Sequence, residues 1–143
     1  MHATTTQPTR LAELALTAAI VELTLTTAYI HLTLGGILFT LNALGYAGLA
    51  ALVAATALPH PVIRRLAWLP RVALAGFTAL TIGAYLVIGP YFALGWVAKG
   101  VEVAILTLIV ADLLQRYGSL AGVLRAIGAT LSSPRRPTSL PAA

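Results

Sequence analysis

Residues 97–103 have the sequence VAKGVEV and place Lys99 and Glu102 three positions apart inside the last long apolar segment of the chain. A charged side chain in hydrocarbon costs several kcal/mol, from about 3 to 10 or more depending on the method. Such residues therefore face a bundle interior, pair with a partner or line a wet path. This stretch predicts a membrane protein with a buried polar cluster.

The composition favours the bilayer as the main solvent. Of 143 residues, 59% are hydrophobic and 9% are charged, whereas about a quarter are charged in an ordinary soluble domain. The net charge of +5 comes from arginines beside apolar spans, where they set orientation and contact anionic lipid. There is no basic stripe with interleaved aromatics, so we expect no nucleic-acid partner. The absence of cysteine excludes disulfides, thiol catalysis and Fe–S clusters.

The pattern predicts an all-α membrane protein with four transmembrane helices and a domain covering residues 11–117. Each apolar run has roughly the 20 residues that cross hydrocarbon, and glycine or proline separates the runs. The predicted spans are 11–32, 37–58, 72–88 and 94–114. The two glycines at 35–36 leave a very tight hairpin between the first two spans. The first span lacks a convincing cleavage site, so we expect a retained anchor rather than a signal peptide.

Residues 118–131 repeat apolar side chains at helical spacing and predict a short amphipathic helix on the membrane surface. Gly118 is a good helix stop and Ser119 a good restart. Residues 132–143 are basic and proline-rich, which predicts a disordered tail.

Orientation follows from the basic residues. Three arginines follow the second span and four follow the end of the fourth, while the turns after the first and third spans carry no lysine or arginine. The positive-inside rule then places both termini, including residues 1–10, in the cytoplasm. We expect a multi-pass protein of the cell membrane, and a bacterial inner membrane would suit it.

Polar residues on three spans are expected at overlapping depths. At a helical rise of about 1.5 Å per residue, Lys99 lies roughly 7 Å from the outer end of its span. By the same measure, Asn42 and Glu102 lie roughly 12 Å from the outer ends of their spans, and Glu22 roughly 15 Å. Glu22 shares a face of the first span with Tyr29, at a spacing of seven residues. Further hydroxyls for the predicted cluster come from Tyr46 and Tyr85.

The charge count leaves two interpretations of this cluster. Lys99 can pair with Glu102 or with Glu22, and the remaining carboxylate then has no basic partner in the membrane. That carboxylate is a candidate for proton exchange. Alternatively, Lys99 reaches the outer interface with Glu102 paired to it, and a protonated Glu22 only holds helices together.

His31 is the histidine at membrane depth and a candidate haem ligand. A second ligand from the same chain is lacking, because His60 falls at the opposite face, so haem b would need two copies or another ligand. No metal site is expected, since no HExxH motif or clustered carboxylates occur. Every serine follows the last span, which removes support for serine catalysis.

Residues 19–22, Ala-Ile-Val-Glu, followed by Thr26 and Thr27, resemble the first helix of small multidrug resistance transporters. That family consists of four-span dimers in which a membrane-embedded glutamate exchanges protons for cationic drugs, and the resemblance implies this role for Glu22. The likeness covers about a dozen residues. The family's glycine-rich third helix is not visible here, and Lys99 and Glu102 depart from its pattern.

Together, the sequence favours a non-enzymatic integral membrane protein, an accessory or oligomeric component that associates with copies of itself or with a membrane-complex partner. Small residues recur every fourth position on the second and third spans, which favours close helix packing; they are Ala43, Ala47, Ala51, Ala55, Ala75, Ala79 and Gly83. The first alternative is a proton-linked transporter or channel for a small solute that uses Glu22, Glu102 and Lys99. The second is a haem- or quinone-binding electron-transfer subunit. No cofactor is predicted by the leading interpretation.

Overall fold

A computed structural model describes residues 10–132, and within them every regular element is a helix, as predicted. The predicted segment before residue 10 and the tail after residue 132 lie outside the described residues. The six helices are α1 (Arg10–Leu34), α2 (Ile37–Ala55), α3 (Pro61–Arg65), α4 (Trp68–Ile88), α5 (Ala93–Tyr117) and α6 (Leu120–Ser132). Of these, α1, α2 and α4 are long and apolar enough to cross a membrane.

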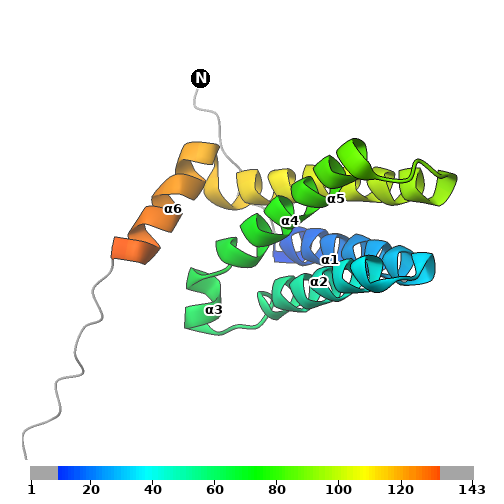
Figure 1. Ribbon diagram of the computed structural model, residues 1–143. Coiled ribbons are helices and arrows are strands. Elements are labelled where there is room, and N and C mark those ends of the chain that lie inside the picture. Colours follow the sequence, from blue (N-terminus) through cyan, green and yellow to red (C-terminus); the bar gives the residue numbers. More distant parts are fainter. Residues whose placement is uncertain (1–9, 133–143) are drawn as a thin grey trace, which may run out of the picture.

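The four long helices pack against one another along their lengths (Figure 1). Helix α1 packs mainly on α2 and α5, and α4 packs on α5 and α2. The turn at residues 35–36 and the loop at residues 89–92 lie at one end, which we call the turn end. The start of α1, the end of α2 and the end of α5 lie at the other, the terminal end, together with α3 and α6 (Figure 1).

Glycine fixes two of the boundaries. Gly35 and Gly36 have φ angles of 71° and 84°, which a residue without a Cβ adopts at no steric cost, so α1 and α2 are joined by a two-residue turn. Gly118, with a φ of 75°, ends α5, and Ser119 Oγ then accepts the N–H of Gly122 at the start of α6.

The third predicted span begins too late. Helix α4 starts at Trp68 rather than at residue 72, because Pro70 lies in its first turn, where the missing N–H has no helical partner in any case. Arg71, predicted as a loop residue, is therefore part of α4 and is fully buried.

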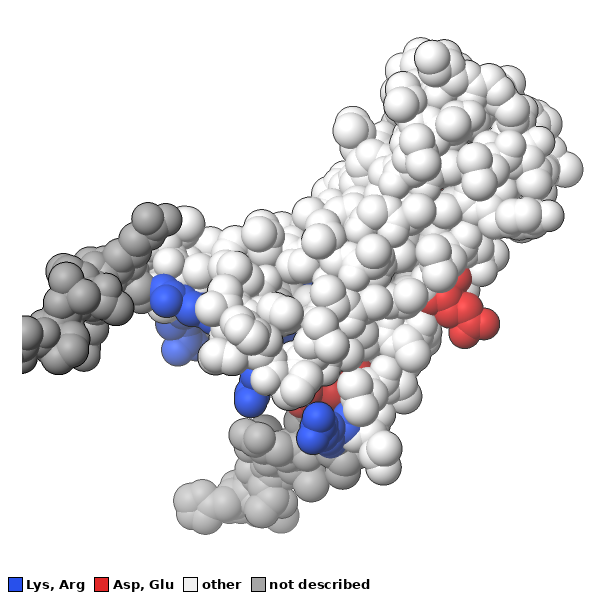
Figure 2. Space-filling view, turned by 90° about the horizontal axis from the view of Figure 1, so that it is seen from below, with Lys and Arg blue, Asp and Glu red and all other residues white. Residues whose placement is uncertain are grey.

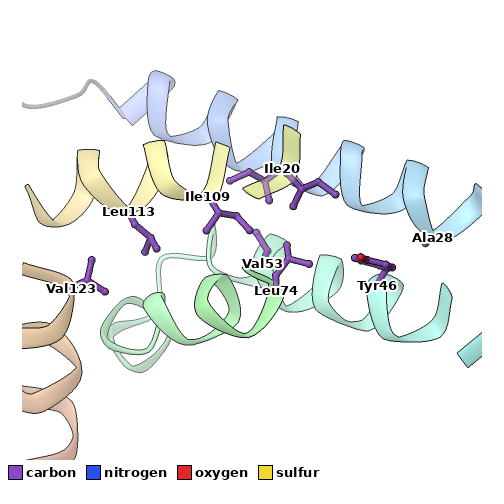
Figure 3. Close-up of a cluster of buried hydrophobic side chains, with 9 residues drawn as sticks. Ile20, Ala28, Tyr46, Val53, Leu74, Ile109, Leu113 and Val123 are labelled. Atoms are coloured by element: carbon purple, nitrogen blue, oxygen red, sulfur yellow. The ribbon is translucent and has the colours of Figure 1, made fainter. Parts of the chain in front are cut away.

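The core consists of apolar side chains from α1, α2, α4, α5 and α6. Its buried members include Ile20, Tyr46, Val53, Leu74, Ile105 and Ile109 (Figure 3). Many large apolar residues on the outside are exposed, among them Ile37 and Val87 at 82% and 79%. An outer surface of this kind is expected where lipid tails are the solvent.

The small-residue ridge predicted on α2 does not stay on one face. Ala43 is 2% exposed, whereas Ala51 is exposed, because residues spaced by four drift around a helix of 3.6 residues per turn. On α4, Ala79 and Gly83 are exposed as well. Ala47, Ala55 and Ala75 are half-buried, so the ridges contribute to the packing of this bundle only in part.

Helix α6 leaves the bundle at the terminal end. Val123 is buried against the core, and Trp68 Nε1 donates to Thr130 Oγ1 at 3.3 Å. Leu120, Leu124 and Leu131 are exposed, so α6 presents an apolar face away from the bundle.

Candidate functional site

Glu102 is the centre of a group of polar side chains near the turn end, the turn-end cluster: Thr27, His31, Tyr46, Thr81, Lys99 and Glu102. It is fully buried. Its Oε2 accepts from Lys99 Nζ at 2.5 Å and from Thr81 Oγ1 at 3.2 Å. Its Oε1 accepts from Thr27 Oγ1 at 3.5 Å. Glu102 on α5 is thus bonded to both α1 and α4.

Lys99 lies inside the bundle. It is 7% exposed, and its Nζ also donates to the carbonyl oxygen of Thr81 at 3.4 Å. The same Nζ lies 5.4 Å from the ring centroid of Tyr85, a distance at which an aromatic face attracts a cation. Lys99 pairs with Glu102 on its own helix, one of the two partners that the sequence allowed.

His31 gives the cluster a site for one more proton. Its Nδ1 lies 2.8 Å from the carbonyl oxygen of Thr27, and because a carbonyl only accepts, Nδ1 carries a hydrogen. Its Nε2 lies 3.7 Å from Glu102 Oε1. In neutral imidazole that nitrogen is an acceptor, so two acceptors face each other unless a proton lies between them. The cluster is neutral without this proton and carries one positive charge with it.

A cavity of about 360 Å³ adjoins the cluster at the turn end. Lys99, His31, Thr81 and Tyr85 contribute to its wall, as does the half-buried Asn42. The rest of the wall is mostly apolar: Leu34, Leu38, Phe39, Phe77, Leu80, Ala84, Ile88, Pro90, Phe92 and Ala98. A concave, largely apolar cavity with a few convergent polar groups is the usual form of a small-molecule site.

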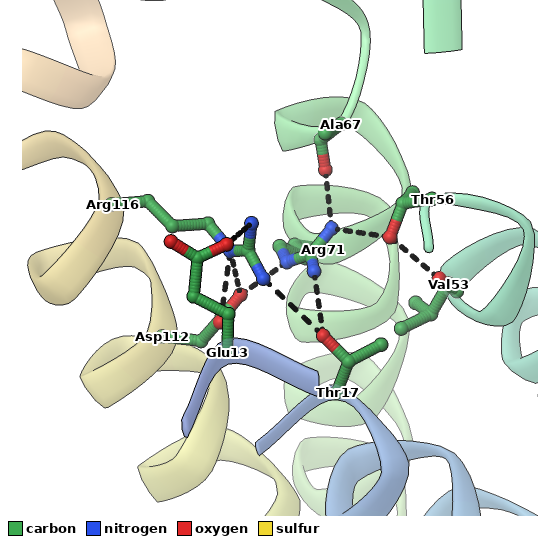
Figure 4. A network of polar contacts seen from close by, with 8 residues as sticks. All are labelled: Glu13, Thr17, Val53, Thr56, Ala67, Arg71, Asp112 and Arg116. Carbon is green, nitrogen blue, oxygen red and sulfur yellow. Dashed lines mark hydrogen bonds and ion pairs between the residues drawn. The ribbon is translucent and has the colours of Figure 1, made fainter. Parts of the chain in front are cut away.

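A second polar network lies at the terminal end and is centred on Arg71 (Figure 4). The Arg71 guanidinium donates Nε–H to Asp112 Oδ2 and Nη2–H to Thr17 Oγ1 at 3.2 Å. Its Nη1 donates to Thr56 Oγ1 at 3.0 Å and to the carbonyl oxygen of Ala67 at 2.8 Å. One buried side chain therefore connects α1, the end of α2, α4 and α5.

Arg116 extends this network toward the surface (Figure 4). Its Nε donates to Asp112 Oδ1 at 2.9 Å, and its Nη1 pairs with Glu13 Oε2 at 3.2 Å. Asp112 is 1% exposed and is neutralised by arginines, because burying a carboxylate without partners would cost more than pairing it.

An apolar layer separates the two networks. Along each helix, fully buried apolar residues fall between the polar ones: Ile20 on α1, Val53 on α2, Leu74 on α4, and Ile105 and Ile109 on α5 (Figure 3). Glu102 and Asp112 are ten residues apart on α5, or about 15 Å. Buried apolar side chains therefore separate the two networks along the bundle, with the hydroxyls of Thr24 and Thr78 buried among them.

The structure brings together four of the eight predicted site residues in this cluster, namely Lys99, Glu102, His31 and Tyr46, and the ring of a fifth, Tyr85, lies beside Lys99 Nζ. Tyr46 is connected through its hydroxyl, 2.6 Å from Thr81 Oγ1. Asn42 lines the cavity without a contact to Glu102. Glu22 and Tyr29 lie on the outward face of α1 and are exposed, so Glu22 takes no part in the cluster. Sequence reasoning missed Thr27, Thr81 and the whole Arg71 network.

The role of His31 as a haem ligand stays a prediction. Both ring nitrogens of His31 face protein groups, so iron could bind only by displacing one of these contacts. Among residues 10–132 there is also no group of three or more histidine or carboxylate side chains placed to hold a metal ion.

Comparisons with protein-family models, with curated proteins and with solved structures give no match for this chain. The resemblance of residues 19–27 to the small multidrug resistance transporters thus gains no support from them, and the function has to be argued from the geometry of the two polar networks.

Proposed function

We propose that the protein is a non-enzymatic, multi-pass membrane protein with four spans, α1, α2, α4 and α5, and with both termini in the cytoplasm of a bacterial cell. Helix α5 supports this topology because its 25 residues are about 37 Å long, and its buried charges pair inside the bundle rather than facing lipid. The arginines gather at the terminal end, which we assign to the cytoplasmic side. The turn end with its cavity then lies in the outer leaflet.

Within this topology, the proposed role is the binding of a small solute together with a proton, as in a proton-linked transporter. The observation that carries it is the placement of buried Lys99 and His31 on the wall of an apolar cavity, with His31 Nε2 facing Glu102 Oε1. A protonated cluster carries one uncompensated positive charge at the cavity wall. A solute with an apolar body and one anionic group would neutralise that charge, so each would favour binding of the other.

Calorimetry on the full chain in nanodiscs tests this role, with benzoate as the probe and benzyl alcohol as its uncharged control. Titration in buffers of different ionisation enthalpy measures proton uptake. We expect benzoate to bind with uptake of about one proton, Glu102→Gln to bind without uptake, and Lys99→Met to lose binding. Glu22→Gln, whose side chain is exposed, is the matched control and should behave as the wild type. Benzoate binding without proton uptake, or equal binding of the alcohol, would contradict the proposal.

A second candidate function, an oligomeric or accessory membrane component, is favoured by the outward face of α1. Glu22, Thr26, Tyr29 and Thr33 share that face and are all exposed. Glu22 lies near the middle of the span, where exposure of a carboxylate to lipid is costly. A second copy of the chain covering this stripe would remove the cost.

Cross-linking in native membranes and the mass of the detergent-solubilised protein test this association. Glu22→Leu should shift the protein toward the monomer, whereas Thr107→Leu, at an exposed threonine of α5, should not. A wild-type monomer, or an unchanged oligomer in Glu22→Leu, would exclude this stripe as the interface.

A further inference from the structure

The terminal end holds a second and larger cavity, of about 560 Å³, which the proposed solute site does not use. We call it the terminal-end pocket. Its wall includes Arg10, Glu13, Leu14, Leu58, Arg64 and Arg116. It therefore joins the start of α1, the chain after α2, helix α3 and the end of α5.

Positive charge is in excess at this pocket. Arg10, Arg64 and Arg116 line it, and Arg71 lies directly behind Thr17 and Thr56. Against these four arginines stand two carboxylates, Glu13 and Asp112, which leaves an excess of two positive charges. Figure 2 shows the same asymmetry on one face, where the basic side chains gather toward the end that carries α3 and α6.

The arginines differ in how many of their guanidinium N–H groups already donate hydrogen bonds to the protein. Arg71 makes four hydrogen bonds to protein groups, and Arg116 is bonded to Asp112, Glu13 and Thr17. Arg10 and Arg64 are exposed, and their guanidinium groups form no hydrogen bond or ion pair with any residue from 10 to 132. Two guanidinium groups at the rim of the pocket are thus free to bind an anion, and the guanidinium fork suits phosphate.

The remaining wall is apolar. Leu14 and Leu58 are 41% and 55% exposed, and Ala57 and Pro59 lie beside them along the chain. A soluble anion would leave these surfaces in contact with water. A phospholipid has a phosphate for the arginines and apolar chains for this wall, and basic pockets between helices on the cytoplasmic side are where anionic headgroups bind.

We infer that the terminal-end pocket binds the phosphate of an anionic phospholipid, with Arg10 and Arg64 as the contacting residues. The inference rests on the proposed membrane topology but not on the solute site at the turn end. The bound lipid would fix the start of α1 and helix α3 against the end of α5.

Native mass spectrometry of the full chain in detergent tests the inference, with phosphatidylglycerol, phosphatidylcholine and inorganic phosphate as separate probes. We expect phosphatidylglycerol to bind more tightly than phosphatidylcholine, and Arg64→Gln and Arg10→Gln each to weaken it about fivefold. The matched control is Arg125→Gln, an exposed arginine of α6 bonded only within its own helix, which should change the affinity little. Glu102→Gln should also leave lipid binding unchanged, which separates this result from the test of the solute site.

Three results would overturn the inference. Equal affinity for the two lipids would mean that the arginines do not select an anion. A loss of phosphatidylglycerol affinity in Arg125→Gln equal to that in Arg64→Gln would mean that the total charge of the protein, not the pocket, attracts the lipid. Displacement of phosphatidylglycerol by millimolar inorganic phosphate would assign the pocket to a soluble anion. Circular dichroism of each variant, with wild-type helicity expected, excludes misfolding as the cause of a loss.

Discussion

Arg71 and Asp112, 41 positions apart in the chain, form an ion pair in which each side chain is 1% exposed. The pair joins α4 to α5 at the terminal end. Each partner has further contacts, because Asp112 Oδ1 also accepts from Arg116 and Arg71 bonds Thr17 and Thr56. Buried charges satisfied to this degree specify how four helices meet.

Replacing one member of this pair should be strongly destabilising. In Arg71→Met, Asp112 loses a buried partner, and removal of one partner of a buried ion pair costs about 3–5 kcal/mol. We expect a loss of that size in the free energy of unfolding, measured by steric trapping or denaturant titration in bicelles. Arg125→Met, at an exposed arginine, is the control and should stay close to the wild type.

The double variant Arg71→Met/Asp112→Leu should recover much of this loss, because neither buried charge remains. If the loss of unfolding free energy in the double variant equalled the sum of the losses in the two single variants, the two residues would not be coupled. The network in Figure 4 would then contribute less to stability than its geometry indicates.

Tyr46→Phe should cost about 1 kcal/mol of stability. The hydroxyl of this fully buried tyrosine lies 2.6 Å from Thr81 Oγ1, and a net hydrogen bond contributes roughly 0.5–1.5 kcal/mol. Tyr29→Phe provides the comparison, since Tyr29 is 69% exposed. Equal stability of the two variants would show that the Tyr46 hydroxyl does not support Thr81.

Gly95→Ala should disturb the cavity at the turn end. A Cβ at Gly95 would lie 2.5 Å from the Tyr85 hydroxyl oxygen, so Tyr85 must move, at a cost of about 1–3 kcal/mol. Gly100, on the same helix, has no atom within 4 Å of such a Cβ, so Gly100→Ala should be neutral or stabilising by about 0.5–1 kcal/mol. Thermal unfolding of both variants, with benzoate affinity as a second measurement, compares them.

The presence of the long helices could be predicted from this sequence, because the length and apolar content of each run decide whether it forms such a helix. Gly35-Gly36 and Gly118 marked turns that the structure contains, and the spacing of Lys99 and Glu102 placed them on one face of one helix. The four-span topology itself remains a proposal, supported by the arginine distribution and by the length of α5.

Helix rotation could not be predicted, and it decides which polar residues meet. Glu22 and Thr24 are two residues apart on α1, yet Glu22 is exposed and Thr24 is fully buried. In a soluble protein the apolar face would mark the interior. In lipid the outer face is apolar as well, so the contrast that would orient the helix is missing.

A signal for the correct face was nevertheless present. The buried polar residues of α1 are Thr17, Thr24, Thr27 and His31, with spacings of seven, three and four. Those of α4 are Arg71, Thr78, Thr81 and Tyr85, with the same spacings. Each of the two helices therefore carries one stripe of hydroxyl, imidazole or guanidinium groups, and both stripes face the interior of the bundle. A search for such matching stripes in the sequence includes Arg71 and excludes Glu22.

The Lys99–Glu102 pair yields the sharpest prediction, because each single variant leaves one charge of a buried pair without its partner. In Lys99→Met, the fully buried Glu102 carboxylate loses its cation. In Glu102→Gln, the buried Lys99 loses its carboxylate. Each variant should lose about 3–5 kcal/mol of unfolding free energy, whereas the double variant Lys99→Met/Glu102→Gln keeps neither charge and should lose less than the two single variants together. Unfolding free energies of the three variants in bicelles measure this coupling, and strictly additive losses would mean that the buried pair does not carry the charges assigned to it.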